Sequence, residues 1–472
     1  MTRLWQWSSI RMWMVVMLSV GMAIHALLRG VFGMALVCIV PTLNGTFVMK
    51  NDFQVDWQLR EISSMHMFFY AGTFLSVFAA HYFTLKFGAK HLISGGIVVG
   101  CVATALIPLT VYISKDYIFT SLLRLLTGIA QGFFIPCSSL LISKWFGPDE
   151  RSTAMAVFTT GNQIGLAVSM FLTAELCRLD IFYGWPLAFL LYGGSGFVFL
   201  VFWMKYGADH PRQSSRITAV ELAHIRDTTS PMITPTSTPF QKLLFSPVVL
   251  SICLSSFCQS FVMVAMTSYL PEFHRSALKL NLSQNALWSA SPFFVQTFSK
   301  IIFGVIADLA KKKLSPTFVA KTGNSIASFG CAVCLLAIGY VECPTTMLIL
   351  LSLGMALTSG YVPGYFTSIV SIAPNYTAAI SAYAQGFAQV ASILSPIVVG
   401  FMTRESSLAE WTEVFQMLAG ILILTGIVFL VFGSASIQKW AYYCKSEPKE
   451  LAGMVDSRGK QSLSLIREDT VE

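Results

Sequence analysis

The stretch YGADHPRQSSRITAVELAHIRDTTSPMITPTSTPFQKL, residues 206–243, divides this chain into two parts. Its Pro, Ser, Thr and charged residues are typical of an aqueous linker, in which we expect a short helix around ITAVELAHI. The rest of the chain differs in character: of all 472 residues, 55% are hydrophobic and 11% are charged, whereas about a quarter of the residues of a soluble protein are charged. The composition therefore predicts an integral membrane protein with a polar break near its middle.

Apolar runs of about 20 residues, the length that crosses a bilayer as a helix, occur on both sides of this linker. Six precede it and six follow it, at 13–40, 62–84, 92–113, 117–142, 153–176, 186–205, 247–270, 286–307, 317–341, 345–368, 376–402 and 411–433. We predict an all-α membrane protein with twelve transmembrane helices in two six-helix halves. Its parts are an N-terminal bundle (1–205), a cytoplasmic linker (206–243), a C-terminal bundle (244–437) and a disordered cytoplasmic tail (438–472).

The basic residues predict how the chain is oriented. If both termini and the linker face the cytoplasm, most of the 31 Lys and Arg residues lie on that side, including the lysine triplet at 311–313, as the positive-inside rule requires. This bias accounts for the net charge of +8 without a nucleic-acid partner. Glycosylation sequons at Asn44 and Asn281 then lie on the opposite side, whereas the sequon at Asn375 lies on the cytoplasmic side and is interpreted as a chance match.

Several other classes of protein are disfavoured. Ten cysteines lie scattered, mostly in apolar runs, so we expect no disulfide framework and no zinc site. Cys331 and Cys334 form a CxxC, which in a membrane helix places two small apolar residues on one face. No HExxH, GxSxG or paired-acid arrangement occurs, so we expect no enzyme, no cofactor and no metal. A receptor would be expected to show seven spans.

Two arginines lie inside the apolar spans: Arg124 in SLLRLLTGIAQGFFIPCSSLL, residues 121–141, and Arg29 in the first span. A charge at this depth costs at least ~2.5–3.5 kcal/mol, so such residues face a wet cavity or a partner. Carboxylates occur only near span ends, at Glu175, Glu272 and Asp308. We therefore expect a substrate anion to supply the missing charge, because guanidinium suits carboxylate or phosphate; bonds to backbone carbonyls are the structural alternative. A third cation, Lys300, either faces the cavity or extends to the cytoplasmic surface.

A longer stretch around Arg124 resembles a known family. RLLTGIAQGFFIPCSSLLISKWFGPDERS, residues 124–152, is similar to the fourth-span signature of the anion:cation symporters, which belong to the major facilitator superfamily. That family includes sialin, the vesicular glutamate transporters and the type I sodium-phosphate transporters. A second match, SIAPNYTAAISAYAQGFAQVASILSPIVVGFMT at residues 371–403, lies in the other half of the chain, so the resemblance covers both halves in the right order.

The fourth span also contains residues that shape a helix. Gly128 and Gly132 form a small-xxx-small face, which permits close helix packing. Pro136 is expected to bend the helix one turn later. The polar turn that follows, with Glu150 and Arg151, is expected to stabilise the fold at the membrane interface.

The resemblance implies a fold and a set of site residues. It implies a central cavity between the two halves and alternating access by rocking of the halves. It places Arg29 and Arg124 at arginines implicated in holding the anionic substrate, and His66 at a histidine tied to function and pH response. Two positions depart from the family: Gln131 replaces a carboxylate that several relatives carry, and Gln259 replaces an arginine of the vesicular glutamate transporters. Both sialin-type proton symport and vesicular glutamate transport are therefore disfavoured.

We thus expect a secondary transporter that moves an organic or inorganic anion, of carboxylate or phosphate type, clamped by Arg29 and Arg124. Coupling to sodium or to protons, and uniport driven by the membrane potential, are all open at this point. The alternative is a transport-inactive sensor or binding protein with the same fold. The expected partners are the small anion and the lipid bilayer, with a monomer as the functional unit, in the plasma membrane or in endomembrane vesicles.

Overall fold

The computed structural model describes residues 9–40, 55–146, 148–179, 184–214, 216–228, 243–373, 376–404, 406–438 and 440–441. Within these ranges the regular elements are helices and no strand occurs, so the prediction of an all-α protein is confirmed. Ten helices are long and apolar enough to cross a membrane. Two more, α2 and α5, have 29 and 30 residues and lie at the second and fifth predicted spans.

The long helices form two groups in the sequence, separated by the linker. The N-terminal group consists of α1 (Ile10–Ile39), α2 (Leu59–Phe87), α3 (Ala89–Ser114), α4 (Tyr117–Trp145), α5 (Pro148–Cys177) and α6 (Trp185–Tyr206). The C-terminal group consists of α9 (Pro247–Ser276), α10 (Leu282–Lys311), α11 (Pro316–Ser325) with η3 (Ile326–Gly330) and α12 (Cys331–Ile338), α13 (Pro344–Leu357) with η4 (Thr358–Tyr361), η5 (Val362–Phe366) and α14 (Thr367–Ser371), α15 (Thr377–Met402) and α16 (Leu408–Phe432). The linker contains η2 (Pro211–Gln213) and α7 (Ala219–Thr228), which is the short helix expected there.

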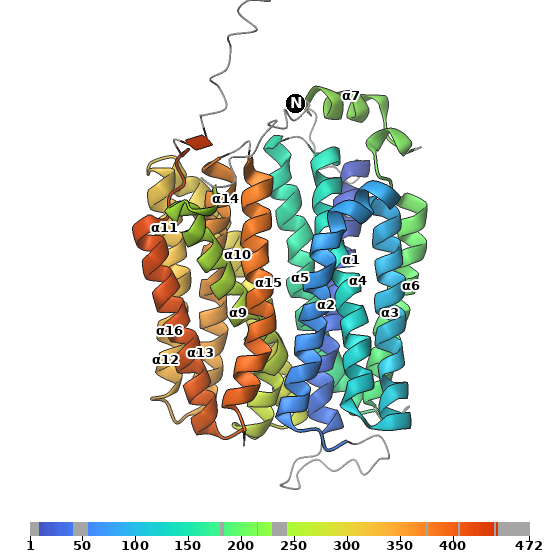
Figure 1. Cartoon of the computed structure of the whole chain (residues 1–472), viewed down its shortest axis with the longest axis vertical. Coiled ribbons are helices and arrows are strands. Elements are labelled where there is room, and N and C mark those ends of the chain that lie inside the picture. Colours follow the sequence, from blue (N-terminus) through green and yellow to red (C-terminus); the bar gives the residue numbers. More distant parts are fainter. Residues whose placement is uncertain are drawn as a thin grey trace, which may run out of the picture.

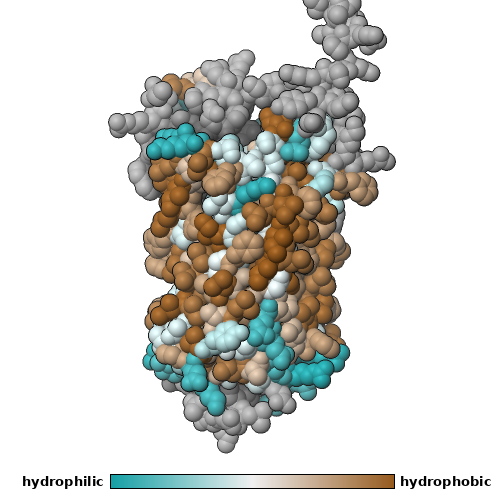
Figure 2. Space-filling model, turned by 90° about the vertical axis from the view of Figure 1, so that its left-hand side faces the viewer, coloured by the Kyte–Doolittle hydropathy of each residue, from teal (hydrophilic) through white to brown (hydrophobic). Residues whose placement is uncertain are grey.

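The helices run side by side, with the N-terminal group on the right of Figure 1 and the C-terminal group on the left. Helix α7 lies at one end of the bundle, where Arg11 Nε at the start of α1 lies 3.6 Å from Glu221 Oε1. We call this the linker end and the opposite one the far end. Figure 2 shows hydrophobic side chains over the middle of one face and hydrophilic side chains toward both ends, as a bilayer-spanning protein requires.

Close packing of α4 against α2 fixes the position of Arg124. A Cβ atom added at Gly128 would lie 1.9 Å from the carbonyl oxygen of Phe69, and one added at Gly132 would lie 1.8 Å from Ser76 Oγ. Only glycine permits this approach of two helix backbones. Helix α4 is continuous through Pro136. Arg124 therefore lies on an unbroken helix, and this helix packs tightly against α2 over two turns.

Two spans of the C-terminal group are interrupted, which the apolar pattern does not predict. The run 317–341 widens into a π-helix at η3, and the run 345–368 passes through the 3-10 helix η4 and the π-helix η5. Gly364 has non-helical dihedral angles there (φ −76°, ψ −119°), next to Pro363, which has no backbone N–H to donate. Hydropathy reports burial and not hydrogen-bond register, so it cannot distinguish these turns from α-helix.

One disulfide is present, although the scattered cysteines predicted no disulfide framework. Cys38 and Cys177 are bonded, with their Cα atoms 6.5 Å apart, at the far-end termini of α1 and α5. They are 139 residues apart in sequence, and only the parallel packing of the first and fifth spans brings them together. Cys331 and Cys334 are free and buried in α12, and the described residues contain no cluster that could hold a metal ion.

Candidate functional site

The Arg124 guanidinium is the most unusual group in the interior. The residue is 1% exposed, and none of its three side-chain nitrogens has a hydrogen-bond partner in the described part of the chain. Its Cζ atom lies 4.6 Å from the ring centre of Phe32 on α1 and 4.5 Å from that of Phe69 on α2. Two aromatic faces stabilise the cation, but they leave all five N–H donors without an acceptor.

Arg29 is half-buried on α1 and carries a second charge close to the first. Its Nη2 donates to Asn162 Oδ1 at 2.7 Å, while its Nε has no partner among the described residues. Arg29 lies near enough to Arg124 for its charge to act on that guanidinium, and Tyr70 lies within electrostatic range of both. Among the described residues no carboxylate lies within salt-bridge distance of either guanidinium. The two cations are therefore held near one another with no protein anion to neutralise them.

His66 lies beside this pair. It is 2% exposed on α2, with its ring centre 5.4 Å from both Phe32 and Tyr269. Its Nε2 has no hydrogen-bond partner in the part of the chain that the structure describes. Phe32 thus contacts both Arg124 and His66. His25, one turn before Arg29, instead packs against Phe134 within the N-terminal group.

The two glutamines singled out in the sequence are in different places. Gln131, two turns after Arg124 on α4, is 5% exposed, and its Oε1 accepts no hydrogen bond from any described residue. Gln259 lies on α9 in the C-terminal group, where its Oε1 accepts a hydrogen bond from the hydroxyl of Tyr365. The structure therefore brings Arg29, Arg124 and His66 together in the N-terminal group and places Gln259 in the C-terminal group.

Sequence reasoning missed a set of amide contacts around these cations. Gln163 Nε2 on α5 donates to Gln296 Oε1 on α10 at 3.3 Å, which joins the two groups of helices. Gln296 Nε2 in turn donates to Thr358 Oγ1 at 2.8 Å. A signal was present in the sequence, because Asn162 and Gln163 form a consecutive polar pair inside the apolar run 153–176.

Hydrogen bonds join the two groups at the far end. The hydroxyl of Tyr269 on α9 donates to Ser63 Oγ on α2 at 2.8 Å and lies 3.2 Å from the carbonyl oxygen of Pro396. Arg275, at the end of α9, donates to the carbonyl oxygens of Val37 and Val40 and forms a 2.7 Å ion pair with Glu272. These contacts hold α1 and α2 against α9 at the far end.

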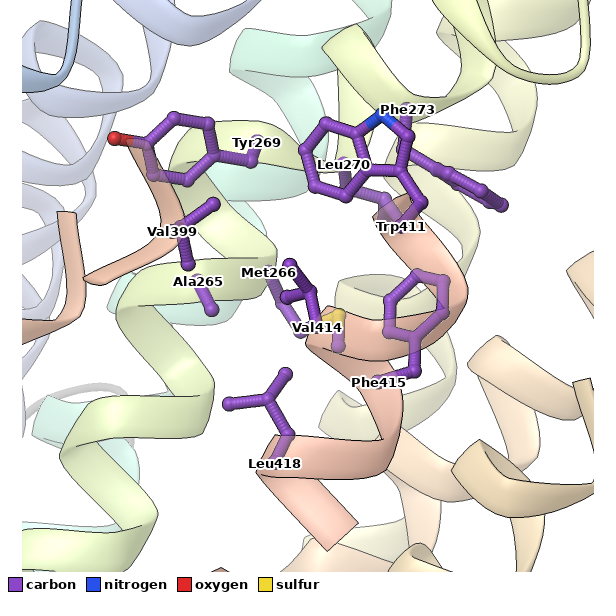
Figure 3. Close-up of a pocket in the computed structure, with 10 residues that line it drawn as sticks. All are labelled: Ala265, Met266, Tyr269, Leu270, Phe273, Val399, Trp411, Val414, Phe415 and Leu418. Carbon is purple, nitrogen blue, oxygen red and sulfur yellow. The ribbon is translucent and has the colours of Figure 1, made fainter. Parts of the chain in front are cut away.

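An apolar pocket lies between α9, α15 and α16 (Figure 3). It is lined by Ala265, Met266, Tyr269, Leu270, Phe273, Val399, Trp411, Val414, Phe415 and Leu418. No lining residue carries a charge, and the hydroxyl of Tyr269 points away from the other lining side chains. The pocket therefore does not suit an anion, and we do not assign the site to it.

The remaining predicted positions lie outside this region. Asn281 is exposed at the far end and caps α10, because its Oδ1 accepts from the backbone N–H of Gln284 at 2.9 Å. Glu150 and Arg151 lie in the first turns of α5, and their side chains fall outside the described part. Asn44 and the tail beyond residue 441 also fall outside it.

Comparison with known proteins identifies the family to which this chain belongs. A family model of the Major Facilitator Superfamily matches residues 18–396. The chain is 28% identical to the uncharacterized transporter slc-17.3 of Caenorhabditis elegans, over 85% of this chain and 78% of that protein. It is 27% identical to vesicular glutamate transporter 1 of Bos taurus (93% and 78% covered) and 28% identical to a probable small intestine urate exporter of Homo sapiens (78% and 74% covered). The resemblance found in the sequence is confirmed, and these relatives are transporters rather than enzymes.

Solved structures with low sequence identity share the fold. The inward-open xylose transporter XylE from E. coli superposes with a TM-score of 0.68 at 13% identity, covering 91% of this chain and 98% of that chain. A bacterial homolog of the human lysosomal transporter Spinster, in its inward-facing and unoccupied conformation, gives 0.65 at 15% identity, covering 90% and 96%.

Proposed function

This chain belongs to the Major Facilitator Superfamily, and on that premise we propose that it carries an anion of the carboxylate or phosphate type across a membrane. It is a multi-pass membrane protein whose relatives are secondary transporters. The observation that carries the anion proposal is the Arg124 guanidinium, which is buried and has no hydrogen-bond partner among the described residues.

The chemistry of the two arginines favours an anionic ligand. A guanidinium remains charged at any physiological pH and offers its N–H donors in a planar fork that matches two oxygens of a carboxylate or phosphate. Asn162 holds Arg29 in one orientation, and the rings of Phe32 and Phe69 hold Arg124, so both forks are positioned before the anion arrives. A preorganised site loses less entropy on binding.

Alternating access supplies the transport step in this proposal. The hydrogen bonds of Tyr269 and Arg275 close the far end, so the anion enters or leaves at the linker end. Binding neutralises Arg29 and Arg124 and lowers the electrostatic cost of closing the linker end around them. Opening of the far end then requires those hydrogen bonds to break.

The relatives and the residues near the arginines limit which substrate and which coupling ion we propose. Glutamate and urate, named for two relatives, are organic anions, which supports an organic anion here. Gln131 cannot titrate, so a coupled proton would need another group such as His66 or His25, whereas sodium coupling and potential-driven uniport need no such group. We propose the plasma membrane or an endomembrane as the location, with the linker and both termini in the cytoplasm.

Uptake by the purified protein in proteoliposomes tests the proposal. A panel of radiolabelled carboxylates and phosphate, each with and without sodium and a pH gradient, identifies the anion and its coupling. We expect Arg124→Ala to abolish saturable uptake and Arg124→Lys to reduce it, because lysine keeps the charge but loses the planar fork. Arg404→Ala, which removes an exposed arginine, is the matched control and should transport normally.

Two results would decide against the proposal. Uptake at the wild-type rate by both Arg124 variants, at equal membrane levels, would show that the arginine does not hold the anion. Ligand-dependent stabilisation of the wild type without any uptake would favour the transport-inactive sensor.

A further inference from the structure

Lys300 is a third cation of interest, after Arg29 and Arg124, and it lies inside the C-terminal group of helices. It lies in α10, about 16 Å along the axis from the helix end at Lys311. Its four-carbon side chain is much shorter than that distance, so it cannot reach the end of α10. Of the two interpretations that the sequence left open, extension to the cytoplasmic surface is therefore disfavoured.

The face of α10 on which Lys300 lies points into the protein. Large apolar side chains exposed by more than half mark the opposite, lipid-facing side: Phe294, Phe298, Ile301, Ile302, Val305, Ile306 and Leu309. Gln296, one turn before Lys300 on the same face, is 1% exposed and contacts Gln163 of the other group. Lys300 thus lies one turn nearer the linker end than a direct contact between the two groups.

Lys300 has no partner among the described residues. It forms no hydrogen bond and no ion pair with any residue that the structure describes, although an ammonium group has three donors. The nearest polar side chains on α10 are occupied elsewhere: Gln296 donates to Thr358, and Ser299 is 2.7 Å from Ser359 Oγ. At Gly304, one turn further along α10, an added Cβ would meet nothing within 4 Å, so there is open space beside the helix at that turn.

The other candidates for a cation in the C-terminal group are engaged or uncharged. Arg275 is paired with Glu272 at the far end, and Lys321 donates to the carbonyl oxygen of Val431 at 3.3 Å. Gln259 is neutral and bonded to Tyr365. In the described part of this group, Lys300 is the interior cation that is free to bind a ligand.

We propose that Lys300 is the anion contact of the C-terminal group, and that the transported anion carries two negative groups, as a dicarboxylate does. One group is held by Arg29 and Arg124 and the other by Lys300. This inference rests on the anion transport proposed above. A substrate that drives rocking of two groups of helices must contact both, and Lys300 provides the charged contact on the second.

The charges favour a dianion over a monoanion. Arg29, Arg124 and Lys300 contribute three positive charges, and no carboxylate in the described part of the chain pairs with them. At low dielectric a monoanion would leave two of these charges uncompensated, whereas a dianion leaves one. The second negative group also gives Lys300 the acceptor that it lacks.

Binding of diacids and their monoamides to the purified full-length protein tests this inference. The probes are succinate, glutarate and adipate, each compared with its monoamide, which keeps the shape but loses one charge. We expect the wild type to prefer one of the diacids by about tenfold or more, the effect of one charge-assisted hydrogen bond. Lys300→Gln should remove this preference by weakening diacid binding and leaving the monoamide unchanged, while Lys300→Arg should keep it. Lys321→Gln is the matched control and should behave as wild type.

Each outcome has a defined meaning. Equal weakening of diacid and monoamide in Lys300→Gln, or no weakening of either, overturns the inference even when anions bind and are transported. Absence of binding and uptake of every anion by the wild type overturns the proposed function itself. Thermal unfolding without ligand separates a structural role: we expect Lys300→Gln to melt at or above the wild-type temperature, because it removes an unpartnered charge, and a clear decrease would count against a ligand role.

Discussion

Tyr269 forms a hydrogen bond that holds the two groups of helices together at the far end, and Tyr269→Phe should loosen that closure. The residue is 1% exposed, and its hydroxyl donates to Ser63 Oγ on the other group. Ser63 itself donates to the carbonyl oxygen of Leu59, so it remains satisfied as a donor after the substitution. Phenylalanine keeps the ring contact with His66, 5.4 Å between centres, so that the change isolates the hydroxyl.

The expected size of the effect follows from the hydrogen bond. One neutral intramolecular hydrogen bond contributes about 0.5–1.5 kcal/mol net. Tyr269 bonds Ser63 only while the far end is closed, so Tyr269→Phe destabilises the closed state by that amount relative to the open state. At about 1.4 kcal/mol per factor of ten, the ratio of open to closed molecules should rise about 2- to 12-fold.

Distances between spin labels at the far end measure that ratio. Suitable positions are Ser114 and Tyr340, which are exposed and lie in different groups of helices. Cys343 and Cys444 are replaced by serine first. Cys343 would otherwise react with the label, because it is exposed and hydrogen bonding with the backbone of Thr346 lowers the pKa of its thiol. Double electron–electron resonance then reports the fraction of molecules at the longer distance.

The control is Tyr82→Phe, which removes a hydroxyl from a side chain that is 63% exposed. It should leave the distance distribution unchanged. An unchanged distribution for Tyr269→Phe as well would refute the reasoning, because it would mean that the far end stays closed without this hydrogen bond.

Three further predictions concern packing and covalent structure. Gly128→Ala should sharply lower the yield and melting temperature, because its Cβ would overlap a carbonyl oxygen of α2, whereas Gly95→Ala, with nothing within 4 Å of its Cβ, should be neutral or slightly stabilising. Asn281→Asp should remove one glycan, seen as a faster band on a gel, with no change in melting because the aspartate still caps α10. Cys38→Ala and Cys177→Ala should lower the melting temperature equally, and the double variant no further.

Much of the fold could be predicted from the sequence because the bilayer imposes a fixed length on each span. The run 117–142 became α4, Tyr117–Trp145, and the polar break held the short helix that its composition predicted. The interrupted helix around Gly364 could not be predicted, since hydrogen-bond register leaves no trace in hydropathy.

Part of the candidate site could be predicted from the sequence for a different reason. A buried charge is rare enough to be noticed, so Arg29 and Arg124 could be identified from residue type alone. The aromatic rings of Phe32 and Phe69 around Arg124 could not, because phenylalanine is common in membrane helices and only the packing of α1, α2 and α4 selects these two.

The disulfide between Cys38 and Cys177 has a consequence for how the protein is made. Both cysteines are in the N-terminal group, so the bond can form as soon as α5 has been inserted, before the C-terminal helices have been synthesised. It requires an oxidising compartment, such as the lumen of the endoplasmic reticulum, at the far end. A nascent chain in which α1 or α5 has been inserted the wrong way round cannot make this bond. Its absence would mark misinserted chains before synthesis is complete.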